Sequence, residues 1–266
     1  MKELKVAAIQ IGLTPSSEKT LEKTVEKLVS EAARKGARIL CFPEHWLEEE
    51  NPNSVLNAME RMKELALKFN VTIIAGGFYE DLEDGTYVTA PVIDPQGRLV
   101  GRQKKVHLFG SERTRAKPGL EYVLFDIDQA RFGVMVCYDT VFPEVARTFA
   151  LKGAEVVFVP SRILNAGTEP WHLYLSTRCL ENRLPLVASN TVSSRRYSGR
   201  SVILVPKQDS DSKIVYSKAL ATGGESQEVL VANLDLETAR NLRESRLAER
   251  RPSTYRLLQT PHSQLA

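Results

Sequence analysis

Residues 131–147 read RFGVMVCYDTVFPEVAR, and the rest of the chain can be interpreted outward from this stretch. The apolar run Val134–Val136 follows a glycine and is typical of a strand that is buried on both faces. Pro143 suits the first turn of a helix, because the N–H that proline lacks would have no partner there. The stretch therefore predicts a buried strand, a sharp bend that carries Cys137, and a helix.

A thiol at such a bend lies near backbone N–H groups and a helix N-terminus, and both favour the reactive thiolate. Free cysteines are, however, mostly small, buried, hydrophobic residues without chemistry of their own. Taken alone, this stretch leaves a reactive Cys137 and an inert Cys137 equally open.

Length and composition limit the class of protein. The chain has 266 residues, enough for one large α/β domain or two small ones, and 42% of them are hydrophobic, which allows a full core. Lys and Arg number 36 against 33 Asp and Glu, and this small excess does not indicate nucleic-acid binding. No apolar run is long enough to span a membrane, and the first residues lack a signal-peptide core.

The cysteines are few and widely spaced. Cys41, Cys137 and Cys179 form neither a disulfide framework nor a CxxC metal motif. A reducing compartment is the simplest setting for such a set, so we expect a cytoplasmic protein.

Strands and helices alternate in the first third of the chain. Val25, Leu28 and Ala32 recur at helical spacing, and Gly36 is a natural C-terminal cap. The pattern predicts strands at residues 4–10, 38–42 and 71–75, and helices at about 17–35 and 54–69. Such an alternation is typical of a parallel α/β unit.

The second half repeats this order. After Cys137 we expect a helix at about 142–152, a strand at 155–159, a helix at about 170–183 and a strand at 186–190. Residues 159–161, Val-Pro-Ser, stand where Phe-Pro-Glu stands at 42–44. A duplicated unit with helices covering two sheets predicts a four-layer αββα sandwich.

Hairpins and a terminal helix complete the expected elements. Their predicted positions are hairpins at 86–102 and 202–216, a loop at 110–119, a strand at 228–232 and a helix from 236 to about 249.

Two polar positions stand out beside this framework. Glu44 comes just past the carboxyl end of its strand, which is where ligands bind in open α/β sheets. Alone, it fits a solvated loop carboxylate better than a buried general base beside Trp46. Lys105 and His107 alternate and would share one face of an extended segment, a cationic face that suits the stabilisation of an oxyanion.

Together these motifs resemble those of the nitrilase superfamily of carbon–nitrogen hydrolases. The resemblance covers almost the whole chain, from Val6 to about Pro252. Glu, Lys and Cys in this order carry more weight than any one motif. The family motifs correspond to Phe-Pro-Glu at 42–44, Lys-x-His-Leu at 105–108, Cys-Tyr-Asp…Phe-Pro-Glu at 137–144, Arg-x-x-Glu-Asn at 178–182 and Gly-x-Ser at 199–201.

The resemblance implies a single hydrolase domain over residues 1–266 and a triad of Glu44, Lys105 and Cys137. Glu44 would act as general base, and Cys137 would form a thioester with the acyl group. Lys105 and the backbone N–H of Tyr138 would stabilise the oxyanion, while Glu112 would hold Lys105 and the substrate. Neither a metal nor an organic cofactor is implied. We expect a structural role for His107, orienting its strand or Glu144.

The substrate stays open at this point. Cys-Tyr-Asp is closer to the amidase and carbamoyl-hydrolase branches than to members that hydrolyse nitriles, although Val141 stands where many amidases have Arg. Arg162 and Trp171 are the pocket candidates; Arg162 would pair with a substrate carboxylate, and an exposed or ion-paired Arg is an equal alternative. A small linear amide or N-carbamoyl compound is the first reading, a nitrile the second, and a non-catalytic binding or scaffold protein the third.

The resemblance also implies an assembly. Family members pair through the helices after the nucleophile, so we expect a homodimer or a larger even homo-oligomer, with the tail from about residue 250 in subunit contacts. Apart from other copies of the chain, the expected partner is the small-molecule substrate, not nucleic acid or a membrane.

Overall fold

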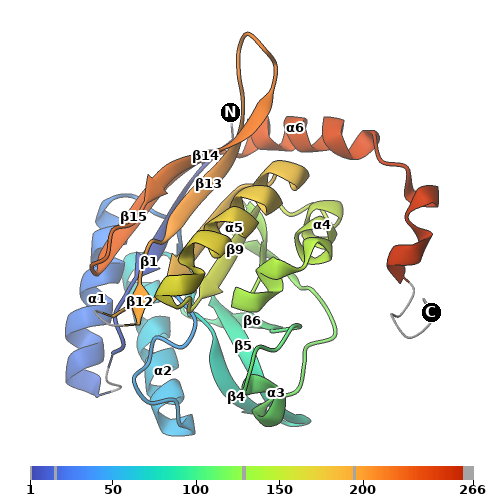
Figure 1. Cartoon of the computed structure of the whole chain (residues 1–266). Helices are drawn as coiled ribbons and strands as arrows, with labels where there is room; N and C mark the ends of the chain where they lie inside the picture. Colours follow the sequence, from blue (N-terminus) through green and yellow to red (C-terminus); the bar gives the residue numbers. More distant parts are fainter. Residues whose placement is uncertain (1, 15–16, 128–129, 194–195, 260–266) are drawn as a thin grey trace.

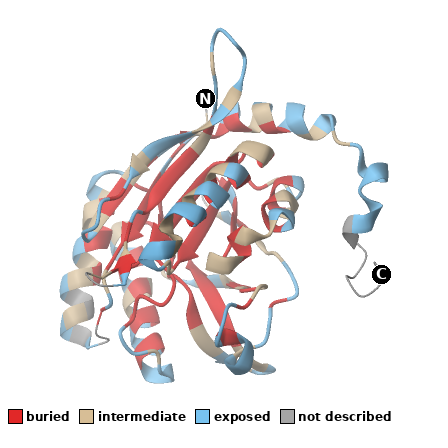
Figure 2. Cartoon of the chain, viewed as in Figure 1, coloured by how far each residue is buried: buried red, intermediate tan, exposed pale blue. Residues whose placement is uncertain are grey.

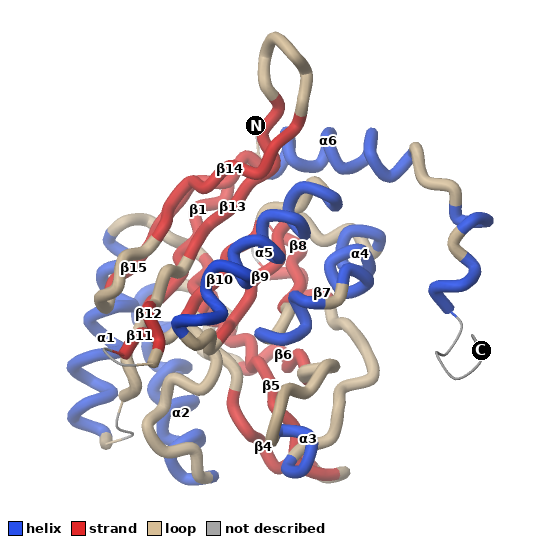
Figure 3. Tube along the Cα trace, in the orientation of Figure 1, coloured by secondary structure: helices blue, strands red, loops and turns tan. Residues whose placement is uncertain are grey.

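Alternating apolar residues along the central strands build two β-sheets that pack face to face, with helices on the outer side of each sheet (Figure 1). The computed structural model describes residues 2–14, 17–127, 130–193 and 196–259. Figure 3 shows the strands gathered at the centre and the helices around them. No helix in these described ranges is long and apolar enough to cross a membrane.

The first sheet has the strand order β15-β1-β2-β3-β5-β4, and β6 pairs with β5. Its three parallel neighbours are β1 (Glu3–Gln10), β2 (Ile39–Cys41) and β3 (Thr72–Ile74). Helices α1 (Glu18–Arg34) and α2 (Pro52–Phe69) connect them. The antiparallel strands are β4 (Phe78–Leu82), β5 (Gly85–Ile93), β6 (Leu99–Lys104) and β15 (Glu228–Asp235).

The second sheet has the order β14-β13-β10-β9-β8-β7. Its parallel strands are β8 (Ala130–Val134), β9 (Val156–Ser161) and β10 (Leu186–Asn190). They are connected by the 3₁₀ turn η1 (Cys137–Val141) with α4 (Pro143–Leu151), and by η2 (Asn165–Gly167) with α5 (Thr168–Asn182). The flanking strands are β7 (Leu124–Ile127), β13 (Val202–Gln208) and β14 (Val215–Thr222), and a small hairpin is formed by β11 (Val192–Ser193) and β12 (Tyr197–Ser198).

Successive side chains of a strand serve different layers. In β1, Val6 and Ala8 pack between the sheets, whereas Ala7 and Ile9 pack with the residues of α1 and α2. A third apolar cluster lies between the second sheet and helices α4 and α5. Figure 2 shows the buried residues concentrated in the strands and on the inner faces of the helices. The predicted four-layer αββα sandwich is confirmed.

Some elements differ from the sequence expectations. β4 was not predicted, because its polar residues Glu80 and Asp81 interrupt the apolar pattern at an edge of the sheet. The expected loop at 110–119 contains the one-turn helix α3 (Glu112–Arg115), which starts at the second glutamate of the site.

The last described elements lie outside the sandwich. Helix α6 (Leu236–Ala248) contacts β1 and β13, and the 3₁₀ turns η3 (Pro252–Thr254) and η4 (Arg256–Gln259) then extend away from the body (Figure 1). Residues 251–257 are exposed, and residues 260–266 of the predicted contact tail lie outside the described ranges.

Candidate active site

The predicted triad converges at the carboxyl ends of strands from both sheets. Glu44 follows β2, Lys105 comes directly after β6, and Cys137 starts the turn after β8. Together with Glu112 of α3, they line one cavity of about 490 Å³. Side chains that are far apart in sequence therefore meet at the edge where ligands enter open α/β sheets.

Lys105 is the buried centre of this cluster. Its ammonium donates to Oε1 of Glu44 and to Oε1 of Glu112, both at 2.8 Å, and its side chain is fully buried. Burial lowers the pKa of Lys105, but the charges of Glu44, Cys137 and Glu112 outweigh burial and raise it above the ordinary value. Lys105 is therefore a fixed cation at the carboxylate pair.

Glu112 is fixed from several sides. Besides the Lys105 contact, its Oε2 accepts the backbone N–H of Phe109 at 2.7 Å. Burial raises the pKa of Glu112, but hydrogen bonds from His45 and Lys105 lower it to about 2. Glu112 consequently stays ionised and accepts a hydrogen bond from the Lys105 ammonium.

Cys137 has a strained backbone and a thiol whose pKa is raised. Its φ is +46°, in the left-handed region that residues other than glycine rarely adopt. The Cys137 side chain lines the same cavity as Glu44 and Arg162. Burial raises the pKa of the Cys137 thiol well above its usual value, and the Glu44 charge raises it further. The bend alone left the reactivity of Cys137 open, and this raised pKa means that the thiolate needs a base to form, since helix α4 begins only at Pro143.

Asp139 braces the turn that carries the nucleophile candidate. Its Oδ2 accepts the N–H of Val136 at 3.1 Å, and its Oδ1 accepts the backbone N–H of His107 at 2.9 Å. The His107 Nδ1 lies 2.8 Å from the same Oδ1, and the ring stacks on Phe142 at 3.7 Å between centroids. His107 thus has a structural role, but its partner is Asp139 and not Glu144.

His45 is a site residue that sequence reasoning missed. Its Nδ1 lies 2.8 Å from Glu50, and its Nε2 lies 3.5 Å from Oε1 of Glu112 and 4.0 Å from Oε1 of Glu44. Burial lowers the pKa of His45, but the three glutamates overcome burial and raise it to about 9. Only its position directly after Glu44 could have indicated this role.

Glu44, His45 and Glu112 offer ligand atoms within 4.8 Å of one another, a spacing that a metal ion could use. The Lys105 ammonium, however, already supplies a cation 2.8 Å from each of the two glutamates. The arrangement fits an ion-pair network around an ammonium group better than a set of metal ligands.

The pocket candidates separate in the structure. Arg162 lines the cavity, its guanidinium lies 4.8 Å from the Tyr197 ring centroid, and its buried Nε has no hydrogen-bond partner among the described residues. Trp171 was expected at the pocket, but it is not one of the described residues that line the cavity. It is buried in the apolar cluster under α4 and α5 with Val145 and Leu175.

Tyr138 follows Cys137 within η1. Its ring packs against Phe109 and Phe142, with centroid distances of 5.0 and 5.4 Å. Its backbone therefore lies beside the cysteine, where an oxyanion would form.

Comparison with known proteins assigns the chain to a family. The family model described as carbon–nitrogen hydrolase matches residues 5–244. The chain belongs to the carbon–nitrogen hydrolase family. The resemblance found in the motifs is confirmed, and the protein is an enzyme, a carbon–nitrogen hydrolase.

Individual relatives of this carbon–nitrogen hydrolase cover most of its length. It is 35% identical to a probable nitrilase of Schizosaccharomyces pombe, over 77% of this chain and 75% of the relative. It is 30% identical to an omega-amidase of Saccharomyces cerevisiae, over 73% of this chain and 69% of the relative. A crystal structure of a carbon–nitrogen hydrolase from Helicobacter pylori superposes with a TM-score of 0.83 at 23% identity, covering 97% of this chain and 99% of the other.

Proposed function

We propose that this enzyme hydrolyses a small linear amide whose acyl group carries a carboxylate, with Cys137 as nucleophile. The observation that carries the proposal is the Lys105 ammonium, held 2.8 Å from both Glu44 and Glu112 in the wall of a cavity that Cys137 also lines. General base, oxyanion-stabilising cation and nucleophile are thus in contact before a substrate binds.

The first half of the reaction forms a thioester. Glu44 takes the proton of the Cys137 thiol, and the sulfur attacks the amide carbon. Lys105 uses two N–H bonds on the glutamates, so its third N–H is free to bind the oxyanion together with the backbone N–H of Tyr138. Collapse of the tetrahedral intermediate breaks the C–N bond, and Glu44 returns its proton to the departing nitrogen, which leaves as ammonia or an amine.

The second half hydrolyses the thioester. Glu44, again ionised, removes a proton from water, and the resulting hydroxide attacks the acyl carbon. Lys105 stabilises the second tetrahedral intermediate as it did the first. When the C–S bond breaks, the proton on Glu44 passes to the sulfur, and the acid product leaves with the thiol of Cys137 restored.

The position of Arg162 supports the proposal that the substrate carries a negative group. Its guanidinium lies at the cavity, and a buried N–H without a partner can bind a carboxylate. Arg196 also lines the cavity, with its guanidinium 6.0 Å from the Tyr197 ring centroid. The similarity to an omega-amidase points the same way. An N-carbamoyl compound or a nitrile is the alternative substrate. The similarity to a probable nitrilase is the reason to test a nitrile.

Ammonia release from a substrate panel tests this proposal. The panel contains monoamides of short dicarboxylic acids, neutral amides of equal length, an N-carbamoyl compound and a nitrile. We expect the monoamides to be preferred, Cys137→Ala to be inactive, and Arg162→Gln to lose the preference while keeping activity on neutral amides. Arg34→Gln, exposed on α1, is the matched control. Equal rates of the wild type on charged and neutral amides would contradict the proposed substrate carboxylate. No turnover of any amide would contradict amide hydrolysis.

We further propose that residues 1–266 act as one domain that pairs into a homodimer or larger even assembly. The core between the sheets contains Val6 and Ile39 from one half of the chain and Val156 from the other. On the outer layer, Leu151 of α4 and Leu173 of α5 are 49% and 68% exposed. Exposed apolar groups on adjacent helices suit a subunit contact.

We infer a reducing, cytoplasmic setting from the cysteines. Cys41, Cys137 and Cys179 are all free thiols. Burial raises the pKa of Cys41 and of Cys179 to about 12, so both are inert and pack as small apolar residues.

A further inference from the structure

Both ring nitrogens of His45 face carboxylates. Nδ1 lies 2.8 Å from Oε1 and from Oε2 of Glu50, and Nε2 lies 3.5 Å from Oε1 of Glu112. An ionised carboxylate can only accept hydrogen bonds, so each nitrogen needs a proton in order to donate, and only the imidazolium carries both. A positively charged His45 can face both carboxylates as a donor, which fits this geometry.

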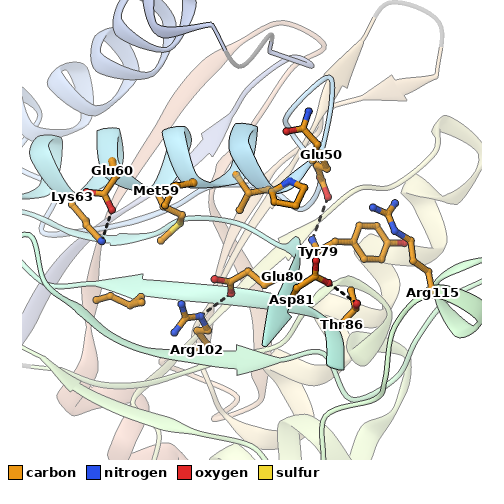
Figure 4. A pocket seen from close by; sticks show the side chains of 15 residues that line it. Glu50, Met59, Glu60, Lys63, Tyr79, Glu80, Asp81, Thr86, Arg102 and Arg115 are labelled. Atoms are coloured by element: carbon orange, nitrogen blue, oxygen red, sulfur yellow. Dashed lines mark hydrogen bonds and ion pairs between the residues drawn. The ribbon is translucent and has the colours of Figure 1, made fainter. Parts of the chain in front are cut away.

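The ring is clamped in this position. The Glu50 carboxylate also accepts the backbone N–H of Tyr79 at 3.3 Å, as Figure 4 shows. The Tyr79 ring lies 5.1 Å from the His45 ring, and the Arg115 guanidinium lies 3.8 Å over Tyr79. Glu50, Tyr79 and Arg115 also line a neighbouring cavity of about 500 Å³, so they form a common wall between it and the active-site cavity.

The contacts form a chain of alternating charge that ends at the thiol. Its members are Glu50, His45, Glu112, Lys105 and Glu44, in that order. With His45 protonated, three carboxylates face two cations. Without that proton, the same three carboxylates face Lys105 alone.

We propose that His45 is a positioning residue of this active site: as an imidazolium it holds Glu112 against Lys105 and offsets the carboxylates, so that Glu44 can accept the thiol proton. This inference rests on the proposed amide hydrolysis. The thiolate and the oxyanion each add negative charge within this cluster, and a second nearby cation stabilises both. The other charged groups that face His45 are Glu44, at 4.0 Å, and Arg115 beyond the Tyr79 ring.

His45→Asn is the variant that tests this role. The backbone of His45 has φ +48°, a left-handed conformation that asparagine tolerates better than most residues. The variant loses the charge and the ring nitrogen that faces Glu112. His172→Asn is the matched control, because His172 lies on the outer helix α5, where its Nε2 contacts the carbonyl of Arg200.

Two readouts separate this role from a purely structural one. The first is the rate at which iodoacetamide alkylates Cys137, followed by peptide mass spectrometry, which needs no substrate. We expect His45→Asn to react about tenfold more slowly at neutral pH, which corresponds to about one unit in the pKa of the thiol. The second is steady-state turnover of a monoamide, for which kcat should fall about tenfold or more while KM stays nearly constant.

The pH profile adds a third readout. Wild-type kcat should fall as pH rises through about 9, where His45 loses its proton, and His45→Asn should lack this fall. Alkylation rates and kcat equal to those of wild type and His172→Asn would overturn the inference. If wild type turns over no amide, the proposed function fails while the alkylation rates still decide the role of His45. If His45→Asn does not fold, Glu50→Gln removes the anchoring charge and should shift the alkylation rate in the same direction.

Discussion

At the residue scale, the site depends on one buried ammonium group more than on an unusually acidic thiol. Burial and the nearby carboxylate of Glu44 both raise the pKa of the Cys137 thiol. The same carboxylate can take the thiol proton only when a cation balances the charge that remains, and Lys105 lies 2.8 Å away for this purpose. Nucleophile activation is therefore a property of the network.

Replacing Lys105 by methionine should lower the stability of the whole protein, because its effect extends beyond any single contact. Glu44 and Glu112 would remain buried without their shared cation, at a cost of about 3–5 kcal/mol in the free energy of unfolding. Urea denaturation measures this directly. The control is Cys137→Ala, which removes a partly buried sulfur and should cost about 1 kcal/mol. Equal stabilities of the two variants would show that the ion pairs do not matter to the fold.

The same network predicts how stability depends on pH. The pKa of His45 is raised from 6.5 to about 9 on folding, so its contribution is fully present below pH 6.5 and is lost as pH rises through about 9. The pKa of Glu112 is lowered from 4.5 to about 2, so its contribution is present above pH 4.5 and is lost as pH falls towards 2. Unfolding free energies measured across this range should decline at both ends, and His45→Asn should lack the alkaline decline. If the alkaline decline is unchanged in that variant, another titrating group causes the decline.

At the element scale, the site is set by how closely two loop segments run together after their strands. Glu44 and Gly77 form an isolated parallel bridge, and the carbonyl of Gly77 accepts the N–H of His45 at 2.8 Å. A Cβ on Gly77 would lie 2.8 Å from Cγ of Glu44. Only glycine leaves the general-base side chain in its place.

Gly77→Ala should therefore impair activity more than stability. The added methyl group pushes on the flexible Glu44 side chain and not on backbone, so we expect kcat to fall about tenfold to a hundredfold with a modest loss of stability. Gly224→Ala is the control, since its Cβ would meet only Oε1 of Glu228 at 3.6 Å. Kinetic and melting measurements on both variants test this prediction. A fully active Gly77→Ala enzyme would mean that a shift of the Glu44 side chain does not affect activity.

The elements that the sequence predicted are those decided by local patterns. The buried strands, the helices and the αββα layers followed from apolar periodicity, and the predicted strand at 186–190 agrees with β10 (Leu186–Asn190). β4 depends on neighbours far away in sequence, and no local signal marks it. The positions of Trp171 and His45 relative to the site could not be predicted from the sequence either, because the direction of a side chain is set by tertiary packing. Motif order indicated Glu44, Lys105 and Cys137; it could not show that His45 completes their charge balance.

At the scale of the whole molecule, the two repeated units meet at the site. The N–H of Glu44, after β2, donates to the carbonyl of Ser161, at the end of β9, at 3.2 Å. These residues hold equivalent positions in the first and second unit, yet only the first unit supplies a carboxylate. The second unit instead supplies Cys137 and Arg162, so each half contributes a different part of the chemistry.

The proposed dimer can be tested with two exposed leucines. Leu173 on α5 is 68% exposed, and Leu67 on α2, on the opposite outer layer, is 61% exposed. If α4 and α5 form the subunit contact, Leu173→Glu should shift the protein from dimer to monomer in gel filtration with light scattering, because it buries a charge at the interface. Leu67→Glu should leave the assembly unchanged. A wild-type monomer, or equal behaviour of the two variants, would argue against this contact surface.

The most direct test of the account is to stop the reaction of a monoamide substrate with acid during turnover and to measure the mass of the Cys137 peptide. The thioester mechanism predicts a mass increase equal to the acyl group on Cys137, absent from Cys41, from Cys179 and from the Cys137→Ala variant. Ammonia release from the wild type without any adduct on Cys137, or undiminished release from Cys137→Ala, would contradict it.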